Sequence, residues 1–131
     1  MLAYWLRFNT VGLAGVAVQL IVLALLTRGW GLDYLTATFL AVEAAVLHNF
    51  AWHEKWTWAD RPARSLSGRL VRLARFHLSN GLTSIAGNLA LMSLLVGHLH
   101  LPVMTANVAA IVACSGANFL LSHLWVFRRN W

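Results

Sequence analysis

The sequence predicts an all-α integral membrane protein, a four-helix bundle built from two parallel repeats of two helices each. Of its 131 residues, 60% are hydrophobic and only 11% are charged, about half the charged fraction that is usual in a soluble domain. Four stretches are long and apolar enough to cross a bilayer. The same landmark residues also return 68 or 69 positions later. A small soluble fold cannot bury so much apolar surface, so a soluble protein is not expected.

Each spanning helix needs about 20 mostly apolar residues. The first expected span ends where Thr27, Arg28 and Gly29 follow it. The fourth begins after Pro102, because proline is tolerated at the first turn of a helix. The four expected spans are Phe8–Leu26, Tyr34–Trp52, Phe76–Val96 and Val103–Phe127.

Lysine and arginine are distributed very unevenly around these spans. One side of the membrane would carry only Arg28. Basic residues favour the cytoplasmic side, so we expect both termini and the middle loop to be cytoplasmic, in the inner membrane of the cell. The net charge of +6 then reflects topology, and a nucleic-acid partner is not expected. The cytoplasmic basic residues would be Arg7, Lys55, Arg61, Arg64, Arg69, Arg72, Arg75, Arg128 and Arg129.

The chain is expected to divide into repeat one (7–58), a basic cytoplasmic loop (59–74) and repeat two (75–129). In the loop, Leu66, Leu70 and Leu73 alternate with arginines. That pattern is typical of a short amphipathic helix lying on an anionic membrane surface. An ordinary positive loop explains the arginines equally well, so both interpretations stay open.

The repeat is visible in pairs of matching residues. Each unit of two spans enters and leaves the membrane on the same side, so the units would be parallel and related by an axis along the membrane normal. All copies of the landmarks would then lie at the cytoplasmic surface. Arg7–Phe8 recurs as Arg75–Phe76, Asn49–Phe50 as Asn118–Phe119, and Trp56 as Trp125, while Trp58 is matched by Phe127.

The duplicated residues allow two interpretations. Aromatic and basic side chains anchor membrane proteins at the interface, so they would form an anchoring belt. Alternatively they bind an anionic lipid headgroup, since arginines pair with phosphate and aromatic rings offer flat surfaces. The candidate headgroup-binding residues are Arg7, Arg75, Arg128, Arg129, His48, Asn49, Trp52, Trp56, Asn118 and Trp125.

Polar residues also occur inside the expected spans. Glu43 lies near the bilayer centre, where a charged side chain costs at least about 2.5–3.5 kcal/mol, so a hydrogen-bonded or proton-binding role is expected. Glu43 points away from a stripe of alanines (Ala37, Ala41 and Ala45), which favours a homo-oligomer, a dimer or larger, with contacts along its face. The intramembrane polar candidates are Glu43, Gln19, Asn80, Asn88 and Asn107.

Four motifs follow one another along nearly the whole chain: RFNTVGLAG (7–15), HNFAWHEKWTW (48–58), RFHLSNG (75–81) and NFLLSHLWVFRR (118–129). In these motifs the chain resembles the GtrA-like family of small four-helix membrane proteins. The resemblance implies binding or transbilayer movement of a polyprenyl-phosphate-linked sugar in cell-surface polysaccharide synthesis. It also allows an accessory role, in which the chain anchors a polyprenyl-phosphate glycosyltransferase.

Little in the sequence supports an enzyme, a metal site or a cofactor. There is no phosphate loop, nucleophile elbow or HExxH motif. His48 and His53 do not share a helix face, so they are expected to be interfacial hydrogen-bond donors rather than metal ligands. A third function is a proton-coupled exporter that uses Glu43. It resembles the small multidrug-resistance type, whose glutamate, however, lies in the first span, where this chain has only Gln19.

Overall fold

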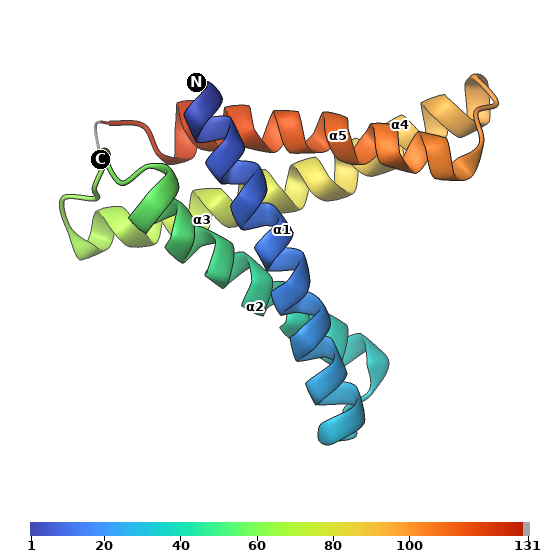
Figure 1. Ribbon diagram of the computed structural model, residues 1–131, viewed down its shortest axis with the longest axis horizontal. Coiled ribbons are helices and arrows are strands. Elements are labelled where there is room, and N and C mark those ends of the chain that lie inside the picture. Colours follow the sequence, from blue (N-terminus) through green and yellow to red (C-terminus); the bar gives the residue numbers. More distant parts are fainter. Residues whose placement is uncertain (130–131) are drawn as a thin grey trace. The chain divides into compact units, whose positions relative to one another are not determined.

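The computed structural model describes residues 1–129, and their side chains except those of Tyr34, Leu35, Ile85, Asn88, Val103, Met104 and Asn107. Within this range the chain is helical in four continuous segments joined by short connections (Figure 1). The segments group into two compact units, unit 1 (Met1–Pro62) and unit 2 (Ala63–Trp131). Each unit is a pair of helices.

In unit 1, α1 (Leu2–Ala24) continues into a π-helical turn, η1 (Leu25–Gly29). The helix begins before the expected Phe8 because no helix-breaking residue lies between Leu2 and Phe8. The chain reverses at Gly31, whose φ is +67°. It re-enters helix at Asp33, whose carboxylate caps α2 by accepting a hydrogen bond of 3.0 Å from the Thr36 backbone N–H. α2 (Tyr34–Trp52) continues into η2 (His53–Thr57) and packs along α1.

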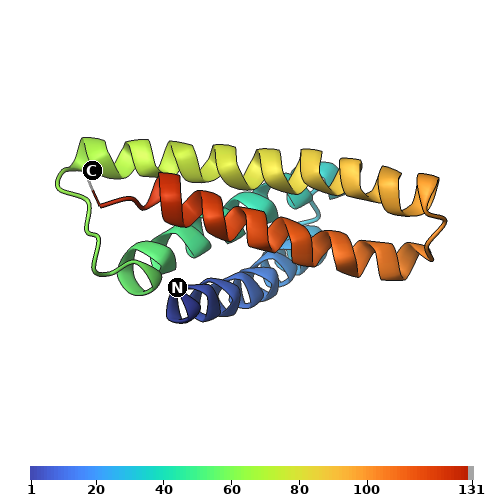
Figure 2. The ribbon, with the colours of Figure 1, turned by 90° about the horizontal axis from the view of Figure 1, so that it is seen from above.

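In unit 2, one uninterrupted helix contains α3 (Leu66–Leu82), η3 (Thr83–Gly87), α4 (Asn88–Met92) and η4 (Ser93–His98). The Ser65 hydroxyl caps α3 by accepting a hydrogen bond of 3.1 Å from the Gly68 backbone N–H. After Pro102 the chain returns as α5 (Val103–Leu121) and η5 (Ser122–Val126). α5 lies alongside α3, η3 and α4 (Figure 2).

The basic segment 59–74, for which a short amphipathic helix and a loop were both expected, is irregular up to Ser65 and helical from Leu66. α3 begins at Leu66, so residues 66–74 are the first turns of a helix that continues without a break past Arg75. The reason is local: Ser65 provides an N-cap, and no proline interrupts the chain between Ser65 and Leu82.

Small residues and one phenylalanine per helix form the core of each unit. The small residues let the helices approach closely. The buried side chains of unit 1 include Phe8, Val11, Ala37, Ala41, Ala45 and Phe50. Those found 68 or 69 residues later are buried in unit 2: Phe76, Ser79, Ala106, Ala110, Cys114 and Phe119.

The outer faces of the helices are apolar. Large side chains such as Leu13, Leu20, Phe39 and Val112 are more than half exposed, a pattern that a soluble monomer rarely tolerates. Among the described residues, Leu2–Gly29 and Val108–Val126 are long and apolar enough to cross a membrane. They overlap the first and fourth expected spans.

Candidate functional site

In unit 1 an arginine of α1 is held against an indole of η2. The Cζ atom of Arg7 lies 5.6 Å from the centre of the Trp56 ring, within the range of a cation–π contact. One guanidinium nitrogen, Nη1, also donates a hydrogen bond of 3.1 Å to the Trp56 carbonyl oxygen. The two contacts fix an exposed positive charge at the end of the helix pair.

Unit 2 contains the matching contact. The Cζ atom of Arg75 lies 5.2 Å from the centre of the Trp125 ring. Burial, together with the positive charge of Arg128, lowers the pKa of Arg75. An anion bound at these two arginines would relieve their mutual repulsion, so the end of unit 2 is also suited to phosphate.

Beneath each arginine lies an aromatic pair that the sequence did not identify as part of a site. The Phe8 and Trp58 rings meet edge to face, with centroids 6.1 Å apart and planes at 66°. The Phe76 and Phe127 rings do the same at 6.2 Å and 70°. Their recurrence next to Arg7 and Arg75 at the repeat offset was the available signal.

His53, expected from the sequence to be an interfacial hydrogen-bond donor, is a member of this buried cluster. Its ring stacks on Phe8 at 4.9 Å and 8°, and Nδ1 lies 2.9 Å from the Thr57 hydroxyl. Burial, reinforced by nearby His48, lowers the pKa of His53 to about 3. His53 is therefore neutral at pH 7 and cannot serve as a cation for phosphate.

His48, Asn49 and Trp52 are brought together near the end of α2. The His48 Nδ1 and Asn49 Oδ1 atoms are 3.1 Å apart, and the His48 and Trp52 rings are 6.3 Å apart. The Asn49 amide lies directly over Gly15 of α1, where any Cβ atom would collide with it. A glycine is thus required for this close approach.

The corresponding polar atoms of unit 2 lack such partners. The side-chain oxygens of Asn118 and Ser122 are buried and accept or donate no hydrogen bond within the described part of the chain. At the repeat offset, Ala117 stands where unit 1 has His48, and Val126 where it has Thr57. Unit 2 therefore lacks the equivalents of His48 and Thr57, the two side chains that contact Asn49 and His53 in unit 1.

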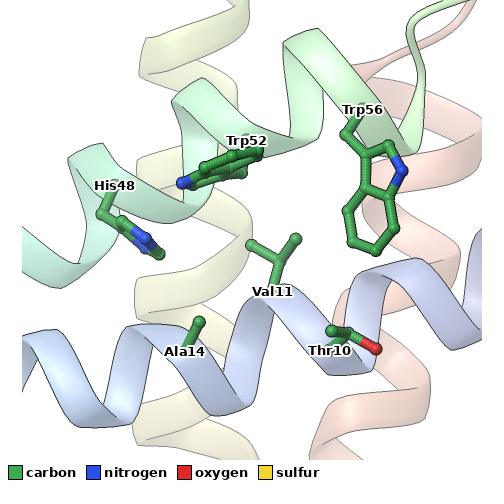
Figure 3. Close-up of a pocket in the computed structure, with 6 residues that line it drawn as sticks. All are labelled: Thr10, Val11, Ala14, His48, Trp52 and Trp56. Atoms are coloured by element: carbon green, nitrogen blue, oxygen red, sulfur yellow. The ribbon is translucent and has the colours of Figure 1, made fainter.

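A cavity of about 270 Å³ lies between α1 and α2–η2. From the second helix His48, Trp52 and Trp56 project toward α1, at intervals of four residues (Figure 3). Thr10, Val11 and Ala14 form the opposite wall. Arg7 is bonded to Trp56, so the positive charge sits at one end of the cavity.

The other predicted residues lie at several places along the two units. Arg128 and Arg129 are exposed after η5, while Gln19, Asn80 and Glu43 are half-buried in their helices. The side chains of Asn88 and Asn107 lie outside the described residues. Where side chains are described, no group of three histidines, cysteines or carboxylates could hold a metal ion.

Fold and site together define a helical membrane protein that holds an arginine against an indole at the end of each helix pair. The family model of the GtrA/DPMS transmembrane domain matches residues 7–127, and the chain belongs to this family. It is also similar to a dolichol-phosphate mannosyltransferase from Pyrococcus furiosus, with 28% identity over 116 residues, which are 88% of this chain. The chain covers 31% of the length of that relative. The family resemblance seen in the sequence is thereby confirmed.

Proposed function

We propose that this protein binds a polyprenyl-phosphate-linked sugar and assists its movement across the bilayer during cell-surface glycan synthesis. The observation that carries the proposal is the placement of one arginine on one indole in each unit, with Cζ to ring-centre distances of 5.6 and 5.2 Å. A guanidinium held in this way is positioned in advance for phosphate, which it contacts through two parallel N–H donors.

The family supports a phosphorylated isoprenoid lipid as the ligand. The matched family model describes a transmembrane domain shared with DPMS proteins, and the relative is named for a reaction on dolichol phosphate. Because the chain covers less than a third of that relative, the proposal is limited to lipid handling and does not extend to sugar transfer. His48, Asn49 and Trp52 in unit 1, and Asn118, Arg128 and Arg129 in unit 2, are proposed as further lipid contacts.

We further propose that the chain is a bundle of four spans made of two parallel hairpins. The support is the correspondence of their elements at an offset of 69 residues: α2 with α5 and η2 with η5. Parallel hairpins would bring both arginine–indole pairs to one membrane face. The positive-inside rule makes that face cytoplasmic.

The test is the lipid that co-purifies with the protein from its membrane. Mass spectrometry should find polyprenyl phosphates or their sugar conjugates with the wild type. Arg7→Gln and Arg75→Gln should each lower their amount at least several-fold, while Arg28→Gln, an exposed arginine at the opposite end of unit 1, should not. Wild-type protein that carries only bulk phospholipid would overturn the proposal.

One observation favours a second function, docking of a glycosyltransferase. The first turns of α3 expose Leu66 and Leu70, at 70% and 57%, next to exposed Arg64 and Arg69. A basic amphipathic surface of this kind suits a partner with an acidic, apolar groove. Co-purification of a glycosyltransferase that is lost in Leu66→Ser/Leu70→Ser but kept in Arg7→Gln would favour docking over lipid binding.

A further inference from the structure

The two units share a scaffold but differ at the cavity of unit 1. On the first helix, Thr10 and Ala14 line the cavity, and the repeat offset places Leu78 and Leu82 at these positions in unit 2. Leucine is much larger than alanine and would fill the space between the helices. Leu78 and Leu82 instead border a different hollow of about 250 Å³, whose other lining residues are His77, Gly81 and Ala86.

The opposite wall differs as well. His48 and Trp52 line the cavity of unit 1, while the offset places Ala117 and Leu121 in unit 2. Only the indole that pairs with arginine is kept, as Trp56 and Trp125. Unit 2 therefore retains the arginine–indole contact without the two aromatic side chains that form the rest of the wall.

The walls of the cavity are almost entirely apolar toward its interior. The Thr10 hydroxyl donates to the Leu6 carbonyl oxygen at 2.8 Å within α1, so its one O–H donor is used inside its own helix. His48 Nδ1 faces the Asn49 amide at 3.1 Å. The indoles of Trp52 and Trp56 remain 50% and 38% exposed. These surfaces suit a hydrocarbon better than a sugar, which would leave its hydroxyl groups without partners.

The charge at one end selects an amphiphile. Arg7 precedes Val11 by one helical turn and is bonded to Trp56. A ligand with a phosphate at Arg7 would therefore extend its chain past Trp56 and Trp52 toward His48. The volume of about 270 Å³ is near the lower limit for a small-molecule pocket, so only the first part of a long chain fits.

We infer that the cavity of unit 1 binds the isoprene units next to the phosphate of the lipid. The inference rests on the proposed function. At unit 2 the side chains that line this cavity are replaced, so Arg75 and Trp125 would contact a phosphate without a matching site for the isoprene units. The rest of the isoprenoid chain lies in the bilayer. A branched, unsaturated chain loses less conformational freedom on binding than a flexible acyl chain, so the cavity favours isoprenoid over acyl phosphates.

The test fills the cavity with the residues that unit 2 already has. Thr10→Leu/Ala14→Leu should weaken binding of farnesyl phosphate at least tenfold, measured through the change in tryptophan fluorescence of purified protein. The reciprocal control, Leu78→Thr/Leu82→Ala, should bind as the wild type does. If the filled variant does not fold, Trp52→Leu, which copies Leu121, is expected to give the same loss.

Ligand arms separate the possible outcomes. The wild type should bind farnesyl phosphate more tightly than dodecyl phosphate, and both more tightly than farnesol, which has no phosphate. The inference is overturned if the filled variant binds like the wild type, if dodecyl and farnesyl phosphate bind equally, or if filling changes only the oligomeric state. If Arg7→Gln loses binding and the filled variant does not, the proposed function holds but the cavity is not the site of the isoprene units. If the wild type neither binds farnesyl phosphate nor carries polyprenyl phosphate, both the inference and the proposed function are overturned.

Discussion

Arg7 and Trp56 are joined twice, by a guanidinium that lies 5.6 Å from the ring centre and by a hydrogen bond of 3.1 Å to the backbone carbonyl oxygen. The pair links the first turns of α1 to the last turn of the hairpin. The equivalent residues of unit 2, Arg75 and Trp125, make the same ring contact at 5.2 Å. Two copies of one contact in a chain of 131 residues indicate that the position of this charge matters.

The contact energy between Arg7 and Trp56 can be measured with a double-mutant cycle. Trp56→Leu removes the ring but keeps the backbone carbonyl, so the coupling with Arg7→Gln isolates the cation–π term. We expect about 0.5–1 kcal/mol, the usual range at exposed sites, from denaturant unfolding in detergent. A coupling energy of zero would show that the ring does not hold the guanidinium.

Gly15 should be intolerant of any side chain. Gly15→Ala forces the Asn49 amide away from α1 and separates it from His48, so we expect a loss of about 1–3 kcal/mol in unfolding free energy. Gly12, three residues earlier in α1, has open space around the position of a Cβ atom. Gly12→Ala should therefore be neutral or stabilise by up to about 1 kcal/mol, because alanine favours helix. Equal effects of the two substitutions would contradict the packing described.

The turn between the two helices of unit 2 should become more stable if it carries the residue that unit 1 has at the same position. His100 has a φ of +55°, and Gly31, 69 residues earlier, has +67°. A side chain in this left-handed region costs about 1–2 kcal/mol. His100→Gly is therefore expected to raise the unfolding free energy by about 1 kcal/mol, and Gly31→Ala to lower it by a similar amount. His100→Ala is the control, which should bring no gain.

The burial of His53 predicts acid-sensitive stability. Its pKa is about 3 in the folded protein, against an ordinary value of 6.5. Below pH 6.5 this histidine becomes protonated in the unfolded chain, whereas His53 of the folded protein stays neutral. The contribution of neutral His53 to the unfolding free energy is therefore fully present above pH 6.5. It declines as the pH falls toward 3, by about 1.4 kcal/mol per pH unit.

His53→Gln should flatten this part of the stability profile between pH 6.5 and 5, although the stability at pH 7.5 will itself be lower. The comparison uses thermal unfolding of both proteins at each pH. His98→Gln changes an exposed histidine and should leave the profile unaltered. A profile that His53→Gln does not change would mean that His53 is accessible to protons in the folded state.

The sequence predicts the helical class, the family and the residues that recur, because these depend on composition and spacing. Alanines at intervals of four in residues 37–45 also indicate a buried stripe, and the structure buries them. Composition is weaker at boundaries: the basic stretch before Phe76 is compatible with a short separate helix or a loop, whereas the Ser65 cap starts a helix that runs on to Leu82.

Contacts between helices were harder to predict. Whether Arg7 reaches Trp56 depends on how α1 packs on α2 and on the π-helical turn η2, which widens the last turn of the hairpin. The cavity was hard to predict for the same reason: the residue types of Thr10 and Ala14 do not indicate a cavity, and they line one only because they lie opposite Trp52 and His48. Comparison of the two repeats position by position was the signal that could have found it.

Two parallel hairpins whose arginine–indole pairs share one membrane face are the central proposal for this protein. Single cysteines test this in a Cys114→Ala background, which copies Ala45, the buried residue at the same position of unit 1. Ala3→Cys and Ala74→Cys lie near the two arginines, and Gly29→Cys and Gly97→Cys lie near the other ends, with open space around both glycines. In intact cells a membrane-impermeant maleimide should label positions 29 and 97, and should reach positions 3 and 74 only after the membrane is permeabilised. Labelling of positions 3 and 74 from opposite sides would contradict the account.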